Sequence, residues 1–239
     1  SGCAIDNLDI TDKTTLLNGE LTFNSRGYNK NYNSNIDETI LINDVILNSF
    51  TYADSGIDGL QNNYKLLLRN LNSNSDNSQN FRQGEDIKLL SSVIFETKLP
   101  LKKENENFNN YLTPRASIRY SPNSTKNNSN LDKKLIYENI YSLDRIDETG
   151  VEGGESLTLG LEYSSRNKKD EDFLNFSIAN ILRLHENSDL PKINNTNDQM
   201  SDFIGSLEII PSKFFDLSYQ FALDNELQTT KYDLIKANI

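Results

Sequence analysis

The stretch that decides the fold runs from residue 111 to residue 163. It opens with YLTPRASIRYSPN at residues 111–123 and closes with VEGGESLTLGLEY at residues 151–163. In both segments apolar and polar residues alternate, which is the two-residue period of a half-buried β-strand and not the period of a helix. A polar loop separates the two segments, and Gly153-Gly154 is a hairpin signal. The stretch therefore predicts antiparallel strands joined by turns and loops.

The same alternation recurs along the whole chain of 239 residues, so that about ten strands are expected. Short turns alternate with longer polar loops between these strands, a pattern typical of outer-membrane proteins. The predicted fold class is all-β: an antiparallel up-and-down transmembrane β-barrel, with this chain forming part of a larger barrel. A soluble β-sandwich is the alternative, because its strands alternate too and its core also uses aromatic residues.

The composition fits a barrel with a wet interior. Hydrophobic residues make up only 36% of the chain, and the mean hydropathy of -0.62 is low for a packed globular core. In a barrel only one face of each strand needs to be apolar. Apolar runs nowhere approach the roughly 20 residues that a membrane-spanning helix needs.

The net charge of -11 excludes nucleic acid as a partner, because phosphate binding needs a basic surface. We expect the acidic residues to solvate the loops, and the alternative is that acidic loops meet divalent cations. One acidic group lies around the Gly-Gly pair and comprises Asp144, Asp147, Glu148, Glu152 and Glu155. Its oxygen atoms suit Ca²⁺ or Mg²⁺, but its spacing is not that of an EF-hand loop. We therefore expect solvated hairpin ends there and predict no metal site.

The sequence offers no constellation for catalysis or cofactor binding. His185 is the only histidine and Cys3 the only cysteine, so a Ser–His–Asp triad and a His/Cys metal site both lack support. We predict that the protein is not an enzyme and has no catalytic, cofactor-binding or metal residues. Cys3 cannot form a disulfide within this chain, and its partner, if it has one, lies in another part of the protein.

Six short motifs in a fixed order resemble a known family. They are KLPLKK at 98–103, LTPR at 112–115, RYSPN at 119–123, NIYSLDR at 139–145, EGG at 152–154 and LGLEY at 159–163. Further on, SDFIG at 201–205 is followed by Pro211. Together they resemble the barrel of the LPS-assembly protein LptD family, the organic solvent tolerance proteins, in an alphaproteobacterial form.

The resemblance implies a role in lipopolysaccharide (LPS) assembly and export. Proteins of this family form a large barrel in the cell outer membrane and insert LPS into its outer leaflet. The implied partners are LPS, outer-membrane lipid, a plug lipoprotein of the LptE type, and a periplasmic bridge of the LptA type that reaches the family's N-terminal domain. Residues 1–239 would form part of one barrel domain, with the N-terminal periplasmic domain and the closing strand absent from this chain.

Two residues are candidates for contact with the cargo. Arg115 and Arg119 share one face of a strand with Ser117, and charge on that face would be costly in lipid. We therefore expect both to face the lumen, either as ordinary lumen lining or as contacts to the phosphates of LPS. Two other functions stay open on the sequence: a passive porin-like outer-membrane channel, and a soluble periplasmic β-sheet binding protein.

Overall fold

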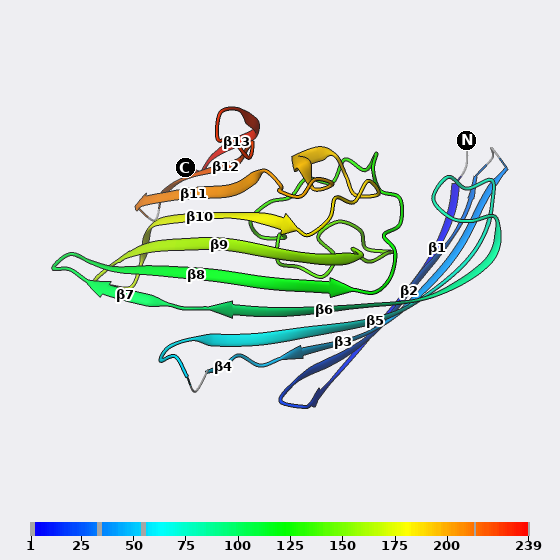
Figure 1. Ribbon diagram of the computed structural model, residues 1–239, viewed down its shortest axis with the longest axis horizontal. Coiled ribbons are helices and arrows are strands. Elements are labelled where there is room, and N and C mark those ends of the chain that lie inside the picture. The colour runs from blue at the N-terminus through cyan, green and yellow to red at the C-terminus, as the bar shows by residue number, and fades with distance from the viewer. Residues whose placement is uncertain (1–2, 33–34, 54–55, 213, 239) are drawn as a thin grey trace.

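A computed structural model describes residues 3–32, 35–53, 56–212 and 214–238, which form a single antiparallel sheet (Figure 1). A short 3-10 helix, η1 (Ile193–Asn195), lies in a loop. Within the described residues no helix is long and apolar enough to cross a membrane. The strands are β1 (Cys3–Leu16), β2 (Gly19–Tyr32), β3 (Ile36–Ser49), β4 (Tyr52–Ala53), β5 (Gln61–Asp76), β6 (Gly84–Lys98), β7 (Leu101–Glu104), β8 (Phe108–Ser121), β9 (Gly154–Asn167), β10 (Asp172–Arg183), β11 (Phe203–Ser212), β12 (Phe215–Leu223) and β13 (Thr230–Asn238).

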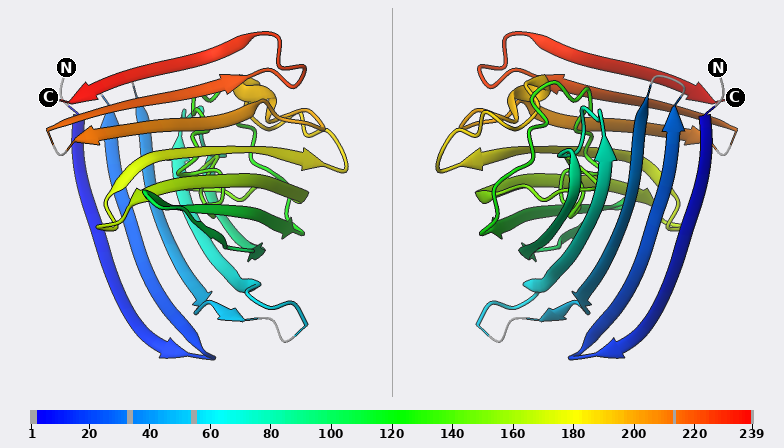
Figure 2. Two further views of the ribbon diagram at one scale, coloured as in Figure 1. Left: turned by 90° about the vertical axis from the view of Figure 1, so that its left-hand side faces the viewer. Right: turned by 90° about the vertical axis from the view of Figure 1, so that its right-hand side faces the viewer.

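The sheet is an up-and-down meander. Its order is β1-β2-β3-β5-β6-β8-β9-β10-β11-β12-β13, while β4 pairs only with β5 and β7 only with β8. The sheet curls around a concave side, and among the described residues β1 and β13 do not pair, so that the sheet stays open (Figure 2). This arrangement confirms the predicted all-β, antiparallel fold of a partial barrel.

Within the residues that the structure describes there are 13 strands, where the sequence predicted about ten. β4 and β7 hold only two and four residues, too few to establish a period. β1 is long, but its second half, Asp-Lys-Thr-Thr, carries no apolar alternation. Residues 137–146 of the long loop form turns and bends. Eleven strands make up the continuous order of the sheet, close to the predicted number, and the additional strands were missed because short or polar strand segments leave little hydrophobic signal.

The two ends of the sheet differ in the length of the connections between strands. Short turns join the strands at one end, such as Leu17 and Asn18, whose positive φ values of 50° and 54° suit a two-residue hairpin. At the other end lie the long segments 122–153, between β8 and β9, and 184–202, between β10 and β11. In barrels of the outer membrane the short turns are periplasmic and the long loops extracellular.

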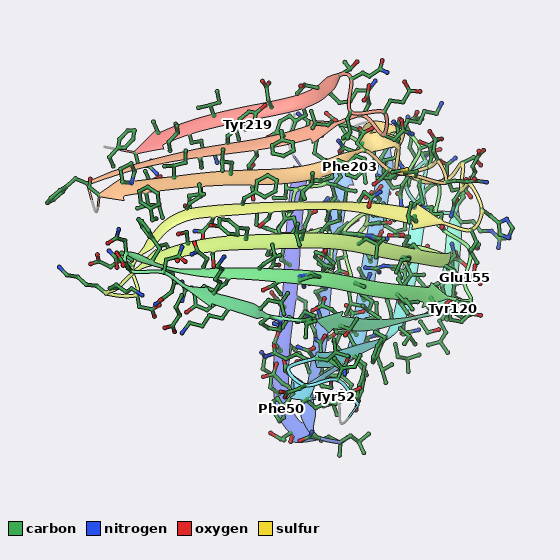
Figure 3. All side chains as sticks on the ribbon, turned by 60° about the vertical axis from the view of Figure 1, so that its left-hand side comes forward. Phe50, Tyr52, Tyr120, Glu155, Phe203 and Tyr219 are labelled. Atoms are coloured by element: carbon green, nitrogen blue, oxygen red, sulfur yellow. The ribbon has the colours of Figure 1, made fainter. Side chains whose placement is uncertain are left out.

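The two faces of the strands differ as the alternation predicts. On β8, Ile118 and Tyr120 are 56% and 47% exposed, whereas the neighbouring Ser117 and Arg119 are 4% and 3% exposed. The convex face is thus apolar and open, and the concave face is polar and covered. Aromatic residues lie toward both ends of the strands, with Phe50 and Tyr52 at the short-turn end and Tyr120 at the long-loop end (Figure 3).

The long loops fold into the concave side of the sheet and cover it (Figure 2). A small apolar core forms there, with Leu135, Ile140 and Tyr141 from the first loop packed against Ala179 and other strand residues. The two loops also join each other, because the Asn128 amide N–H donates to the carbonyl oxygen of Asp189 at 2.7 Å. The largest apolar cluster of the described residues therefore lies between the loops and the strands of the C-terminal half, and two smaller clusters lie around β3, β5 and β6.

The Gly153-Gly154 pair does not make a hairpin, which corrects the sequence interpretation. It ends the long loop at the start of β9. A Cβ on Gly153 would lie 2.2 Å from the carbonyl oxygen of Asn123, so this position requires a close backbone approach. Gly154 has a φ of 80°, which is a left-handed conformation that favours glycine.

Candidate functional site: the concave face beneath the loops

Arg115 and Arg119 both project from β8 onto the concave face, as their spacing predicted. Arg115 donates to Glu96 at 2.8 Å and to Glu162 at 3.1 Å. Its guanidinium lies 3.6 Å from the ring centroid of Tyr141, close enough for a cation–π interaction. Arg115 therefore ties β6 and β9 to the loop that carries Tyr141.

Arg119 lies deeper and is covered by the same loop. It donates to the carbonyl oxygens of Leu143, at 3.0 Å, and of Ser142, and its Nε is 3.9 Å from Glu152. The two arginines thus share a face but bind different partners within the chain. Contact of either side chain with LPS stays a prediction.

Glu152 is the centre of a buried arginine network that the sequence interpretation missed. Arg145 binds both of its carboxylate oxygens, with Nε at 2.7 Å from Oε2, and Arg183 of β10 binds Oε1. Arg145 also donates to the carbonyl oxygen of Ile140 and to the hydroxyl of Thr158, each at 2.9 Å. Three guanidinium groups, counting Arg119, therefore surround one carboxylate beneath the loops. The loop is anchored to β8, β9 and β10 at this point.

Burial by itself raises the pKa of Glu152, but the charges of Arg145 and Arg183 outweigh it and hold that pKa well below its usual 4.5. The carboxylate is therefore ionised at neutral pH. The pKa of Asp144 is shifted in the opposite direction: burial raises it, and the nearby charge of Arg69 does not fully offset this effect. Solvated ends were expected for all five acidic residues of this segment, and that prediction is wrong for Glu152, which is buried, whereas Glu148 and Glu155 are exposed.

A second network anchors the same loop to the N-terminal strands. Arg69 of β5 is 0% exposed and binds Asp44 of β3 with two hydrogen bonds of 2.7 and 2.8 Å. It also donates to the carbonyl oxygen of Gly150 at 2.7 Å and to Asp144 at 3.3 Å. The sequence signal was that Asp44 and Arg69 each stand, beside an asparagine, among the leucine, isoleucine and valine residues of a strand. Without knowledge of the register, those charges could not be paired.

The arrangement holds elements together and carries no recognisable catalytic set. Among the described residues no group of three or more metal-ligating side chains occurs. His185 is exposed in the second long loop. The side chain of Cys3 lies outside the described residues. The geometry provides a concave face to which the two long loops are held by ion pairs, hydrogen bonds and a small apolar core.

Comparison with known proteins assigns the chain to a family. The family model described as LPS transport system D, LptD, matches residues 50–238, which span β4 to β13 and include both arginine networks except Asp44. A search of the curated proteins finds no match. The match covers most of the chain, and the antiparallel sheet with an apolar convex face fits it. The chain therefore belongs to the LptD family of outer-membrane LPS transport proteins.

Proposed function

We propose that this protein forms part of an outer-membrane barrel that delivers LPS to the outer leaflet. The observation that carries the proposal is the family match over residues 50–238. The facing of the strands supports it, since an apolar convex face suits lipid and a polar concave face suits a lumen. The protein acts by positioning and passage, and no bond is made or broken.

The proposed setting is one barrel domain that includes residues 1–239 and is completed by further strands. The edges of β1 and β13 are unpaired among the described residues, and unpaired backbone groups are costly in hydrocarbon. As partners we propose LPS itself, an LptE-type plug lipoprotein, and an LptA-type periplasmic bridge that delivers LPS through an N-terminal domain. The proposed location is the cell outer membrane.

The role of Arg115 and Arg119 within this function has two versions. In the first, the pair contacts the phosphates of LPS, because guanidinium donors match phosphate oxygens. In the second, the pair lines the lumen and fixes the loop, which the bonds to Glu96, Glu162 and two loop carbonyls favour. We propose the second as the main role.

A passive porin-like channel is the alternative within the membrane. The two long loops argue against a porin-like channel. They pack onto the concave face around the core of Ile140, Ile181 and Leu190 and so narrow the lumen. A soluble periplasmic binding protein would instead need its convex face covered, and that face exposes leucine, isoleucine and phenylalanine on several strands.

The deciding experiment is controlled depletion of the full-length protein in its native cell. Newly made LPS, labelled in a pulse, should fail to reach the cell surface while uptake of small solutes stays normal. Restoring the wild-type gene should return surface LPS. Loss of solute uptake with normal LPS delivery would contradict the proposal and favour a porin-like channel. A protein that stays dispersed without detergent would favour the soluble alternative.

A further inference from the structure

The short strand β7 creates a groove at the short-turn end of the sheet, where it runs beside β8 (Figure 1). Pro100 separates β7 from β6, and proline cannot continue a hydrogen-bonded ladder. The groove measures about 390 Å³, and its lining is almost entirely apolar. It lies apart from the arginine networks, which are beneath the loops.

Three side chains form a row across the strands at this groove. Leu101 is opposite Leu112, and Leu112 is opposite Tyr163 of β9. Leu112 has the same parity along β8 as the exposed Ile118 and Tyr120, so the row faces the convex side. Leu101 and Leu112 are 46% and 37% exposed. The row therefore presents a continuous apolar floor on the membrane-facing side.

The rim of the groove is polar and ordered. The hydroxyl of Tyr163 donates to Oδ1 of Asn110 at 2.9 Å, which fixes the ring across the floor. Lys103 is opposite Asn110 and is exposed. Lys102 also lines the groove, but its ammonium is 2.6 Å from Glu104 and is neutralised. Lys103 forms no ion pair among the described residues, so it is the uncompensated cation of this rim.

We propose that this groove binds an anionic phospholipid of the inner leaflet. One acyl chain would lie along the row of Leu101, Leu112 and Tyr163, and Lys103 would bind the phosphate. Lysine side chains extend along apolar surface and keep the ammonium at the headgroup level. The site is at the short-turn end, which is the periplasmic side in barrels of this kind, and there phospholipid is the neighbouring lipid. The inference rests on the membrane placement and not on the movement of LPS.

The test uses the full-length protein purified in detergent, with phosphatidylglycerol and phosphatidylcholine offered separately and bound lipid measured by native mass spectrometry. The wild-type protein should retain phosphatidylglycerol more strongly. Lys103→Gln should lower retention of phosphatidylglycerol by about fivefold, since one lysine near an anionic headgroup contributes roughly that factor. Retention of phosphatidylcholine, whose quaternary ammonium offsets the charge of its phosphate, should fall by less, and Lys103→Arg should restore the wild-type preference.

Lys168→Gln is the matched control. Lys168 is an exposed lysine at the same end of the sheet, it contacts Asn109 at 3.2 Å, and it does not line the groove. Its replacement should leave the retention of both lipids unchanged. Leu112→Asn should lower retention of both lipids, and a normal circular dichroism spectrum would show that this variant is folded.

Three results would overturn the proposal. The first is equal retention of the two lipids by the wild-type protein, and the second is an equal loss in Lys103→Gln and Lys168→Gln. The third is displacement of phosphatidylglycerol by inorganic phosphate alone, which would reveal an anion site without an acyl chain. Surface delivery of LPS in the Lys103→Gln strain is measured in parallel. Because that delivery tests the proposed function and lipid retention tests the groove, either can fail without the other.

Discussion

At the residue scale, the chain concentrates its buried charge where the first long loop meets the concave face. Glu152 holds Arg145 and Arg183, and Arg69 holds Asp44. Replacing one partner of a buried ion pair lowers the stability of the fold more than replacing both partners by apolar residues. The reason is that the remaining charge is left buried without a partner. These residues are therefore expected to determine whether the loop stays folded.

Glu152→Gln should destabilise the folded loop by about 3–5 kcal/mol, the usual result of breaking a buried pair from one side. The measurement is the guanidinium concentration at which the detergent-solubilised protein unfolds, together with protease cleavage within residues 122–153. Glu155→Gln is the control, because Glu155 is exposed beside the same glycine pair. Equal sensitivity of the two variants would refute the assigned role of Glu152.

The lowered pKa of Glu152 also predicts an acid dependence. A carboxyl whose folded-state pKa is depressed contributes stability that is fully present above its unfolded pKa, near 4.5, and that is lost as the pH falls through the folded-state value. Protease resistance of the loop should thus hold from pH 7 to about pH 4.5 and decline only in stronger acid. The Glu152→Gln variant has no carboxyl at this position, so its protease resistance should depend less on pH in this acid range. A pH profile identical to that of the wild-type protein would contradict the prediction.

Gly160 offers a second test at this scale. A Cβ there would lie 2.0 Å from the hydroxyl of Tyr141, so the missing side chain leaves room for this hydroxyl beside β9. Gly160→Ala should displace Tyr141 and cost about 1–3 kcal/mol, as overpacking usually does. The change is measured in the same unfolding experiment, with Ser164→Ala on the same face of β9 as the control. Unchanged stability would mean that Tyr141 moves freely.

The pair Arg115 and Arg119 is tested by replacing both with Gln in the full-length protein. If they serve mainly to fix the loop, the variant should expose residues 122–153 to protease and lower the amount of folded barrel. If they serve mainly to bind LPS phosphates, surface delivery of LPS should fall while barrel abundance stays normal. Crosslinking from a photoreactive residue at position 117 distinguishes the two, because only the second version captures LPS.

At the scale of the element, the long central strands have an apolar convex face and a polar concave face. β10 illustrates this division at its middle, where Ile178 is paired with Leu161 and Gly205 and Ser177 is paired with Glu162 and Ser206. Phe176 and Ile178 therefore continue the apolar row of the convex face. The odd positions continue onto Ala179 and Ile181, which pack under the loops.

Ile178→Arg should impair assembly of the barrel, whereas Ser177→Arg should be tolerated. An arginine on the lipid face near the bilayer midplane costs about 2–4 kcal/mol, while one on the lumen face stays in water. The measurement is the amount of folded, heat-modifiable protein in isolated outer membranes. Equal amounts for the two variants would show that the faces of β10 are assigned wrongly.

At the scale of the whole molecule, the sheet is open and its two edge strands are long. β1 and β13 present unpaired N–H and C=O groups among the described residues, and such edges promote pairing with other chains. The loops and the two arginine networks stabilise the concave side but leave the edges unprotected. We therefore expect a curved sheet of this kind to need lipid or detergent on its convex face and pairing partners at its edges.

Residues 1–239 expressed alone should therefore aggregate in plain buffer or require detergent to stay dispersed. Sedimentation in buffer and in detergent measures this directly. A monomer that unfolds sharply and reversibly in plain buffer would contradict the membrane assignment as a whole. The same preparation, mixed with excess protein of unrelated fold, controls for nonspecific precipitation.

The sequence by itself determined the fold class, the facing of the strands and the family, because these depend on local alternation and on ordered motifs. Ile118 and Ser117 are assigned to opposite faces by parity alone, and the structure confirms it. The motifs from residue 98 to Pro211 lie within the family match. Polar strand segments such as the second half of β1 were missed, since they carry no apolar period.

Only the tertiary structure decided where the charged residues lie and what they bind. Glu152 and Glu155 are three positions apart and look alike in the sequence, yet one is buried among arginines and the other is exposed. Arg69 and Asp44 are 25 positions apart and meet because of the register between β3 and β5. Long-range pairing is set by how the loop folds onto the sheet, a cooperative event that depends on many contacts at once. Local periodicity contains no information about that event. For this reason the sequence predicted the strands of the barrel but not how the long loops fold onto their concave face.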